Sequence, residues 1–325
     1  MSIKEFAKNA REAYFTLPNG DKIPSIGLGT WRSGKDETKN AVCAALKAGY
    51  RHIDTAHIYG NEKEIGEGIR ESGVPRTDIW VTSKLWCNAH RAGLVPLALE
   101  KTLQDLNLEY IDAYLIHWPF ALLSGPEELP RNEKGELIYE DVPIEETWQA
   151  MEELLETGKV RYIGISNFNN EYLDRVLKIA KVKPTIHQME LHPYLPQTEY
   201  LEKHKKLQIH VSAYSPLANQ NDAYNSDISK LIEHKTLVDI ANARGEGITP
   251  ANIAISWAVK RGTSVLPKSV NESRIVSNFL YIPLTDKEME AINNIGVVRR
   301  FSHGKFAPKP MFVGLQDGTP KQTHA

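Results

Sequence analysis

The segment Gly49-Tyr-Arg-His-Ile-Asp54-Thr-Ala-His-Ile-Tyr59-Gly-Asn-Glu62-Lys-Glu-Ile-Gly66 gives the clearest indication of how this chain folds. Within it, the run His52–Thr55 is short and contains β-branched residues, which is typical of a strand. An amphipathic stretch, Glu37–Ala48, precedes the run, and helical residues around Lys63 follow it. A strand between two helices predicts an α/β fold built on a parallel sheet.

The same alternation continues on both sides of this segment. Eight candidate strands occupy Ile26–Gly29, His52–Thr55, Ile79–Leu85, Tyr110–His117, Tyr162–Ile165, Thr185–Met189, His210–Tyr214 and Thr263–Leu266. Amphipathic stretches between them occupy Glu37–Ala48, Leu94–Leu106, Ile144–Thr157, Glu171–Ala180, Leu231–Ala243 and Ala251–Val259. Because no linker interrupts the alternation, we predict one domain over residues 1–325, folded as a closed (β/α)8 TIM barrel. A doubly wound open sheet is the alternative.

Three segments lie outside this alternation. Pro18-Asn-Gly-Asp21 stands between two extended runs, and its Asn-Gly pair predicts a β-hairpin over residues 14–24. Two long irregular segments are Phe120–Pro143, after the fourth strand, and Arg299–Ala325, at the end of the sequence. Loops of this length in a compact domain are usually functional or disordered. We expect a long loop at the first and a mobile tail at the second.

Composition limits the partners and the compartment. The formal net charge is −2 and hydrophobic residues make up 41% of the chain, so a nucleic-acid partner is not indicated. Two cysteines, Cys43 and Cys87, cannot form a disulfide framework. The sequence shows no secretory h-region and no uncharged apolar run of about 18 residues. These features predict a cytoplasmic protein with no membrane span.

Active-site residues of a parallel barrel come from the carboxyl ends of its strands. Four residues of useful chemistry fall at or just after predicted strand ends, namely Asp54, Tyr59, Lys84 and His117. Each alone has an ordinary explanation, such as a helix cap, a surface lysine or a core histidine. Placed together on one rim, they indicate a catalytic site.

These residue types suit the reduction of a carbonyl group. A buried lysine beside a phenol favours the phenolate and lowers the tyrosine pKa from about 10. Lys84, held by Asp54, therefore predicts a Tyr59 that donates a proton near neutral pH. His117 could orient the carbonyl oxygen, which gains a proton while the carbon gains hydride.

Two competing motifs overlap this region. Tyr59 and Lys63 match the Tyr-x-x-x-Lys of short-chain dehydrogenases, but Gly27–Gly34 lacks the G-x-G-x-x-G turn of a Rossmann domain. The segment His52–His57 contains two histidines and an aspartate that could bind a metal ion. No second cluster with ligand spacing accompanies it, so we predict no metal site.

Three stretches together resemble the aldo-keto reductase family over essentially the whole chain. They are Gly49–Gly66, Ile163–Phe168, and Leu266–Ser269 with Arg274, Ser277 and Asn278. The resemblance implies a (β/α)8 barrel that binds an extended nicotinamide dinucleotide without a Rossmann domain. It also implies an NAD(P)H-dependent reductase with Tyr59 as proton donor and Lys84, Asp54 and His117 in support. We expect a small carbonyl compound as its partner, and a monomer or weak homodimer.

The resemblance also assigns cofactor contacts. The nicotinamide would stack on Tyr214, and its carboxamide would bind three polar residues, Ser166, Asn167 and Gln188. The segment after the last strand matches one that holds an adenosine 2′-phosphate, which favours NADPH. Its Ser277 stands where many relatives have an acidic residue, which leaves NADH possible. The other implied contacts are Gly29, Thr30, Trp31, Asp54, Ser215, Leu217, Lys268, Ser269, Asn271, Arg274 and Asn278.

Aromatic residues after the strand ends would wall a substrate pocket beside Tyr59 and His117. They are Trp31, Trp86, Trp118 and Phe120, and such walls suit small carbonyl compounds. The segments Tyr139–Trp148 and Arg299–Ser302 resemble fungal sugar reductases of the xylose reductase kind. This implies an aldose, a uronate such as D-galacturonate, or glyceraldehyde. Trp118 and Ser302 replace the Phe and Asn common in those enzymes, so xylose itself is not favoured.

Two further alternatives concern charge and turnover. Arg32, Arg299 or Arg300 could pair with the carboxylate of a uronate, or Arg32 could contact a cofactor phosphate while the tail arginines are solvated. The chain could also be a nicotinamide-binding regulatory or structural barrel without turnover, as in potassium-channel β-subunits or lens crystallin relatives of this family. Because Asp54, Lys84 and His117 are all present together with Tyr59, the sequence favours an enzyme.

Overall fold

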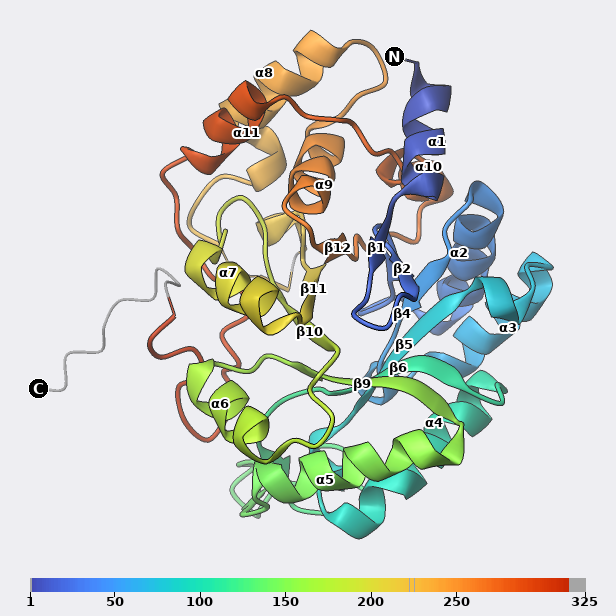
Figure 1. The fold of residues 1–325 in the computed structure, drawn as a ribbon, viewed down its shortest axis with the longest axis vertical. Coiled ribbons are helices and arrows are strands. Elements are labelled where there is room, and N and C mark those ends of the chain that lie inside the picture. The colour runs from blue at the N-terminus through green and yellow to red at the C-terminus, as the bar shows by residue number, and fades with distance from the viewer. Residues whose placement is uncertain (1, 222, 225, 316–325) are drawn as a thin grey trace, which may run out of the picture.

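The computed structural model describes residues 2–221, 223–224 and 226–315. Its centre is a sheet of eight parallel strands with helices around it (Figure 1). The strands are β3 (Leu28–Gly29), β4 (His52–Asp54), β5 (Trp80–Leu85), β6 (Ile111–Ile116), β9 (Val160–Ser166), β10 (Ile186–Glu190), β11 (His210–Tyr214) and β12 (Ser264–Val265). Each coincides with one of the predicted strands, and nearly all of their residues are buried, as expected of a parallel sheet covered on both faces.

The sheet closes on itself. Its strand order is β12-β11-β10-β9-β6-β5-β4-β3, and its two edge strands meet through parallel bridges, Ile26 with Val265 and Gly29 with Lys268. The fold is therefore a (β/α)8 barrel, and the open doubly wound sheet is excluded. Because all the strands run the same way, their carboxyl ends gather at one end of the barrel, where catalytic residues are expected.

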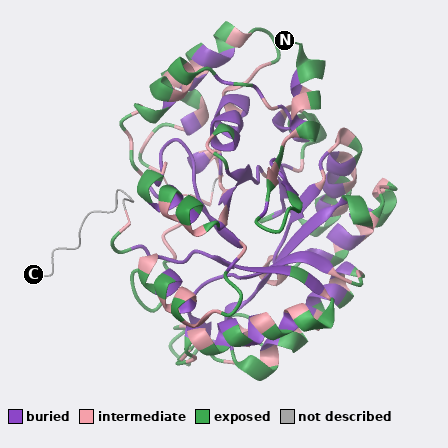
Figure 2. Ribbon diagram, in the orientation of Figure 1, coloured by how far each residue is buried: buried purple, intermediate pink, exposed green. Residues whose placement is uncertain are grey.

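Eleven α-helices occupy the described residues, and most of them have one buried and one exposed face (Figure 2). They are α1 (Ile3–Glu12), α2 (Lys35–Ala48), α3 (Glu62–Ser72), α4 (Val95–Leu106), α5 (Ile144–Leu154), α6 (Asn170–Ile179), α7 (Thr198–Leu207), α8 (Lys235–Arg244), α9 (Pro250–Lys260), α10 (Glu272–Asn278) and α11 (Asp286–Asn293). Helix α3 packs so closely on α4 that a Cβ at Gly66 would lie 1.9 Å from the Leu106 carbonyl oxygen. The glycine in the opening segment is thus a packing requirement.

A β-hairpin covers the amino end of the barrel. Strands β1 (Tyr14–Thr16) and β2 (Lys22–Pro24) pair antiparallel. Leu17 and Ile23 from this hairpin pack into a buried cluster that includes Trp80 and Ile186, the first residues of β5 and β10. Since this end is covered by apolar packing, the opposite end is left for a ligand.

The two long irregular segments identified in the sequence, after the fourth predicted strand and at the end of the chain, are more ordered than a loop and a mobile tail would be. The first contains a short antiparallel pair, β7 (Ala121–Leu122) with β8 (Tyr139–Glu140). In the second, the Arg299 amide donates to the Tyr194 carbonyl oxygen at 2.6 Å and the Arg300 side chain is buried. The prediction of a mobile tail is therefore wrong for residues 299–315, and residues 316–325 lie outside the described part. Among the described residues, no helix has both the length and the apolar character needed to cross a membrane.

Candidate active site

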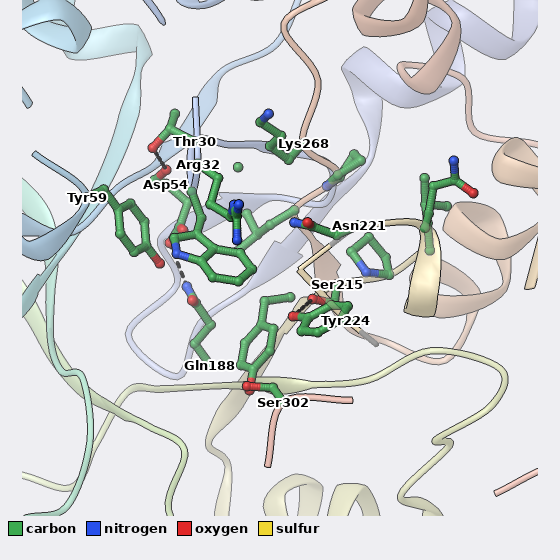
Figure 3. Close-up of a pocket in the computed structure, with 18 of the residues that line it drawn as sticks. Thr30, Arg32, Asp54, Tyr59, Gln188, Ser215, Asn221, Tyr224, Lys268 and Ser302 are labelled. Carbon is green, nitrogen blue, oxygen red and sulfur yellow. Dashed lines mark hydrogen bonds between the residues drawn. The ribbon is translucent and has the colours of Figure 1, made fainter. Parts of the chain in front are cut away.

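A cavity of about 830 Å³ opens at the carboxyl end of the barrel (Figure 3). Most of the residues predicted for the site line it, namely Gly29, Thr30, Trp31, Asp54, Tyr59, Trp86, His117, Trp118, Ser166, Asn167, Gln188, Tyr214, Ser215, Leu217, Lys268, Ser269, Arg274 and Asn278. Lys84 is not part of the lining because it is fully buried beside Asp54. Phe120, Asn271 and Ser277 do not line the cavity.

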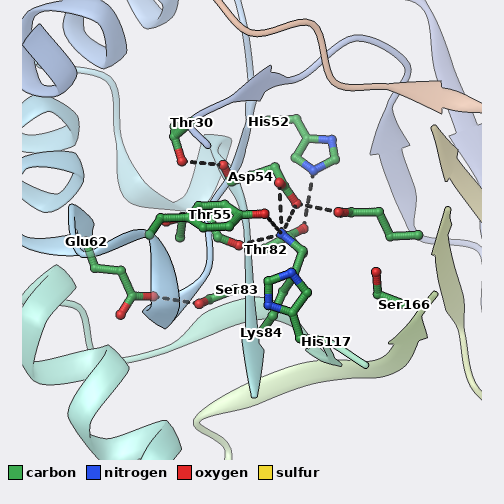
Figure 4. A network of polar contacts seen from close by, with 12 residues as sticks. Thr30, His52, Asp54, Thr55, Glu62, Thr82, Ser83, Lys84, His117 and Ser166 are labelled. Carbon is green, nitrogen blue, oxygen red and sulfur yellow. Dashed lines mark hydrogen bonds and ion pairs between the residues drawn. The ribbon is translucent and has the colours of Figure 1, made fainter. Parts of the chain in front are cut away.

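Asp54 and Lys84 form a buried ion pair (Figure 4). The Lys84 Nζ lies 3.0 and 2.9 Å from the two carboxylate oxygens and 2.6 Å from the Thr55 carbonyl oxygen. Gln188 donates a further hydrogen bond to Asp54 at 2.6 Å. Burial raises the pKa of Asp54 and lowers that of Lys84, while their mutual contact opposes both shifts. With every charged atom hydrogen-bonded, we assign both groups as ionised.

Tyr59 stands above this pair on a turn of 3-10 helix, η1 (His57–Tyr59). Its hydroxyl lies 3.5 Å from the Lys84 Nζ. Burial, with the nearby charge of Asp54, raises the Tyr59 pKa well above its ordinary value. The predicted lowering of the Tyr59 pKa is not found in this structure, because burial, and after it the charge of Asp54, raises the pKa instead. The phenol therefore carries its proton at neutral pH, which is the form that a general acid needs.

His117 lies against Tyr59. The ring centroids are 5.8 Å apart in an edge-on arrangement, and the Trp86 ring lies 5.3 Å away on another side. Burial, with a smaller effect of Lys84, lowers the His117 pKa well below its usual value, so the imidazole is neutral. Its Nδ1 has no hydrogen-bond partner among the described residues. Tyr59 and His117 thus present two polar groups to the same end of the cavity.

Four polar residues from three neighbouring strands lie beside this pair. The Tyr214 hydroxyl donates to the Asn167 Oδ1 at 2.7 Å, and the Asn167 Nδ2 donates to the His117 carbonyl oxygen at 3.0 Å and to the Ser166 Oγ at 3.1 Å. Asn167 has a positive φ of 60°, a conformation that asparagine tolerates better than most residues. The network fixes the Tyr214 ring and leaves the Ser166 hydroxyl proton and the Gln188 amide oxygen to bind a polar ligand.

The far end of the cavity is cationic. Arg32, Lys268 and Arg274 all line it, and Lys268 is close enough to the other two for their charges to lower its pKa, after the larger effect of burial. Glu37 opposes them. Two predicted neighbours serve the helix instead: the Asn271 side chain caps α10, and Ser277 bonds to the Arg274 carbonyl oxygen. This end suits a phosphate group.

The aromatic wall matches the prediction in part. Trp31, Trp86 and Trp118 line the cavity, whereas Phe120 is buried behind them, 6.2 Å from the Trp118 ring. Several lining residues were missed because they lie in loops, 3-10 turns, the start of α9 or the C-terminal segment, where strand patterns give no signal. They are Ile58, Pro216, Ala218, Gln220, Asn221, Tyr224, Lys230, Ile232, Ala251, Val270 and Phe306.

Two arginines proposed to bind a substrate carboxylate are engaged elsewhere. Arg299 forms an ion pair with Asp227. Arg300 is buried, lies over the Phe312 ring and donates to the Gln197 side chain at 3.2 Å. Neither lines the cavity. The idea that one of them meets a uronate is therefore wrong, and so is the alternative that both are solvated.

No metal site was predicted for His52–His57, and its two histidines and aspartate are not among the described groups whose ligand atoms lie close together. His52 is buried, and its Nε2 lies 3.3 Å from the Thr82 hydroxyl (Figure 4). A different group, His57 with Glu62 and Asp105, brings its ligand atoms within 4.8 Å of one another. The Glu62 oxygens already accept hydrogen bonds from Ser83 and Thr102, so the group needs no ion to satisfy them.

Comparison with known proteins agrees with this architecture. The family model for the aldo/keto reductase family matches residues 25–296. An uncharacterised oxidoreductase of Schizosaccharomyces pombe is 64% identical over 97% of this chain and 98% of its own length. Human aldo-keto reductase family 1 member A1 is 42% identical over 85% of this chain and 88% of its own length.

Solved structures lead to the same family. The aldose reductase of Giardia lamblia superposes with a TM-score of 0.81 at 38% identity, covering 89% of this chain and 98% of that one. The aldose reductase of Schistosoma japonicum gives a TM-score of 0.80 at 38% identity, covering 86% and 91%. The chain belongs to the aldo/keto reductase family, and it is an NAD(P)H-dependent oxidoreductase that acts on small carbonyl compounds.

Proposed function

We propose that this enzyme uses NADPH to reduce the aldehyde group of a small, uncharged sugar-type compound, such as an aldose or glyceraldehyde, to the alcohol. One observation carries the proposal: Tyr59, whose hydroxyl lies 3.5 Å from the Lys84 Nζ, and His117 meet at one end of a cavity whose other end is lined by cations. The first end suits a carbonyl group and the second suits a phosphorylated dinucleotide.

The residues divide the chemical work. The nicotinamide, when bound, supplies the hydride. Tyr59 donates the proton that the carbonyl oxygen needs, and Lys84 stabilises the phenolate left behind. His117 donates a hydrogen bond that holds the carbonyl oxygen beside Tyr59. Tyr214 offers its ring to the nicotinamide, and Ser166 and Gln188 bind the carboxamide.

NADPH is proposed over NADH because of Lys268 and Arg274. Replacing Lys268 with methionine should raise the Kd for NADPH by about tenfold, the loss expected for one charge-assisted contact, and leave the Kd for NADH nearly unchanged. Fluorescence titration with both cofactors measures this. Lys47→Met, at an exposed site in the last turn of α2, is the matched control. Equal weakening of both cofactors would contradict a 2′-phosphate contact at Lys268.

An uncharged substrate is proposed because the walls beside Tyr59 and His117 are aromatic, formed by Trp86, Trp118 and Phe306. The described cations that line the cavity are Arg32, Lys230, Lys268 and Arg274, of which Arg32 and Arg274 lie near Lys268 and Arg32 also lies over the Trp31 ring. Among the uronates named above, galacturonate should therefore react with a kcat/KM about tenfold lower than that of galactose, because its carboxylate loses water without gaining a partner.

A panel assay that follows cofactor oxidation tests both the function and the charge preference. It contains glyceraldehyde, galactose, galacturonate and galacturonate methyl ester, which has the size of the acid without its charge. The ester should react like galactose. A galacturonate that reacts faster than its ester would show that a cation does serve the substrate end.

We also infer a cytoplasmic enzyme, because both cysteines are free thiols in this structure, and we expect it to act as a monomer or weak homodimer.

A further inference from the structure

A buried carboxylate outside the reacting set lies behind the substrate end of the cavity. Glu190 is the last residue of β10 and is fully buried. We propose that Glu190 is a positioning residue: it anchors the C-terminal segment Arg300–Ser302 to the barrel and so places Ser302 and Phe306 in the wall of the substrate pocket. The inference rests on the proposed function, because it assigns that pocket's substrate binding to this anchor.

Glu190 accepts hydrogen bonds from two consecutive backbone amides of this segment. The Phe301 amide donates to its Oε1 and the Ser302 amide to its Oε2, each at 2.8 Å. A carboxylate can accept both bonds because each oxygen is an acceptor, whereas a glutamine has only one such oxygen. Both residues are 111 or more positions from Glu190 in sequence, so the contact fixes a distant segment onto the barrel wall.

Cationic and polar side chains complete the environment of Glu190. The His192 Nε2 lies 2.9 Å from Oε1, and an Arg300 guanidinium nitrogen lies 3.8 Å from Oε2. The Gln197 side chain connects Arg300 to β10, since it accepts a hydrogen bond from the Arg300 guanidinium and donates one to the Glu190 backbone carbonyl oxygen. Burial alone raises the pKa of Glu190, but the contacts with His192, Arg300 and the Phe301 amide bring it below its usual value. The anchor is therefore charged at neutral pH.

The anchored segment reaches the site directly. Ser302, labelled in Figure 3, and Phe306 line the cavity, and the Ser302 side chain interacts with that of Tyr214, which lines it too. Glu190 is also the parallel-sheet partner of Tyr214. One carboxylate thus fixes a pocket-lining residue from behind, while the same strand pair fixes the ring offered to the nicotinamide. Neither contact involves the reacting groups Tyr59 and His117, so the anchor should act on substrate binding more than on the chemical step.

Glu190→Gln tests the anchor, because it keeps the shape but places an amide donor against a backbone amide donor. The KM for glyceraldehyde should rise about tenfold, equivalent to about 1.4 kcal/mol, with kcat and the Kd for NADPH nearly unchanged. Hydrogen exchange at the Phe301 and Ser302 amides should become faster in the full-length variant. Arg300→Met should shift KM and exchange in the same direction by a smaller factor, and it serves if Glu190→Gln does not fold.

Asp112→Asn is the matched control. Asp112 is also a buried carboxylate that accepts a backbone amide, from Val81, and pairs with Arg76, but it lies near the amino end of β6. Its replacement should change the free energy of unfolding without changing KM. If hydrogen exchange at the Phe301 and Ser302 amides were unchanged in both Glu190→Gln and Arg300→Met, the proposal that Glu190 anchors this segment would be wrong. Faster exchange with an unchanged KM would overturn its role in the pocket. A wild-type enzyme with no turnover would instead refute the proposed function, while the exchange data would still decide the anchor.

Discussion

Replacing Tyr59 with phenylalanine should lower kcat for aldehyde reduction by about 10² to 10⁴-fold, the usual contribution of a general acid. The ring remains, so the pocket keeps its shape and the Kd for NADPH should change little. The hydroxyl's contact with Lys84, at 3.5 Å, is too long to contribute much to stability. Steady-state kinetics and cofactor titration on the same preparation measure both quantities.

Tyr162→Phe provides the control for this prediction. Tyr162 belongs to the buried cluster at the amino end of the barrel, where its hydroxyl accepts a hydrogen bond from Asn19 at 2.8 Å and donates one to Asp21. Losing these two contacts, both near the protein surface, should reduce stability by about 1 to 2 kcal/mol and leave kcat unchanged. Undiminished turnover by Tyr59→Phe would mean that another group donates the proton. A wild-type enzyme that binds NADPH but reduces no aldehyde would favour the regulatory barrel.

The strands of the barrel could be predicted because their signal is local. Each is a short β-branched or apolar run between amphipathic stretches, and burial on both faces leaves little room for other patterns. Helix α1 gave no such signal, since only Phe6 and Ala10 of its ten residues are buried. Arg300 was misjudged for the opposite reason: an arginine is expected in solvent, and its burial depends on Glu190, which is distant in sequence.

In the active site, too, the residue types could be predicted from the sequence, whereas the effect of their surroundings could not. The sequence places Asp54, Tyr59, Lys84 and His117 at strand ends, and the barrel brings them together. The direction of the Tyr59 pKa could not be predicted, because it depends on how deeply the phenol is buried and on how fully Asp54 cancels the charge of Lys84. Distances and burial decide between opposing effects that a sequence can only name.

Replacing Lys84 with methionine should affect both stability and catalysis. The variant leaves Asp54 buried without its cation, so the free energy of unfolding should fall by about 3 to 5 kcal/mol. Turnover should also fall strongly, because no positive charge remains to stabilise the Tyr59 phenolate. Urea unfolding and kinetics at neutral pH measure the two effects. Lys235→Met, which removes one partner of an exposed pair with Asp239, should cost at most about 1 kcal/mol.

The pH dependence of this variant identifies the cause. Burial without a cation holds the Asp54 pKa in the folded variant above its unfolded value of about 3.9. Protonation of Asp54 then favours the folded state. The loss in free energy of unfolding relative to wild type should therefore be smallest below the unfolded pKa, and it should grow as pH rises through the folded pKa. Asp54→Asn combined with Lys84→Met removes both charges, so it should recover much of the stability but not the turnover. A double variant as unstable as Lys84→Met would show that packing around the lysine stem, rather than the unpaired carboxylate, causes the loss.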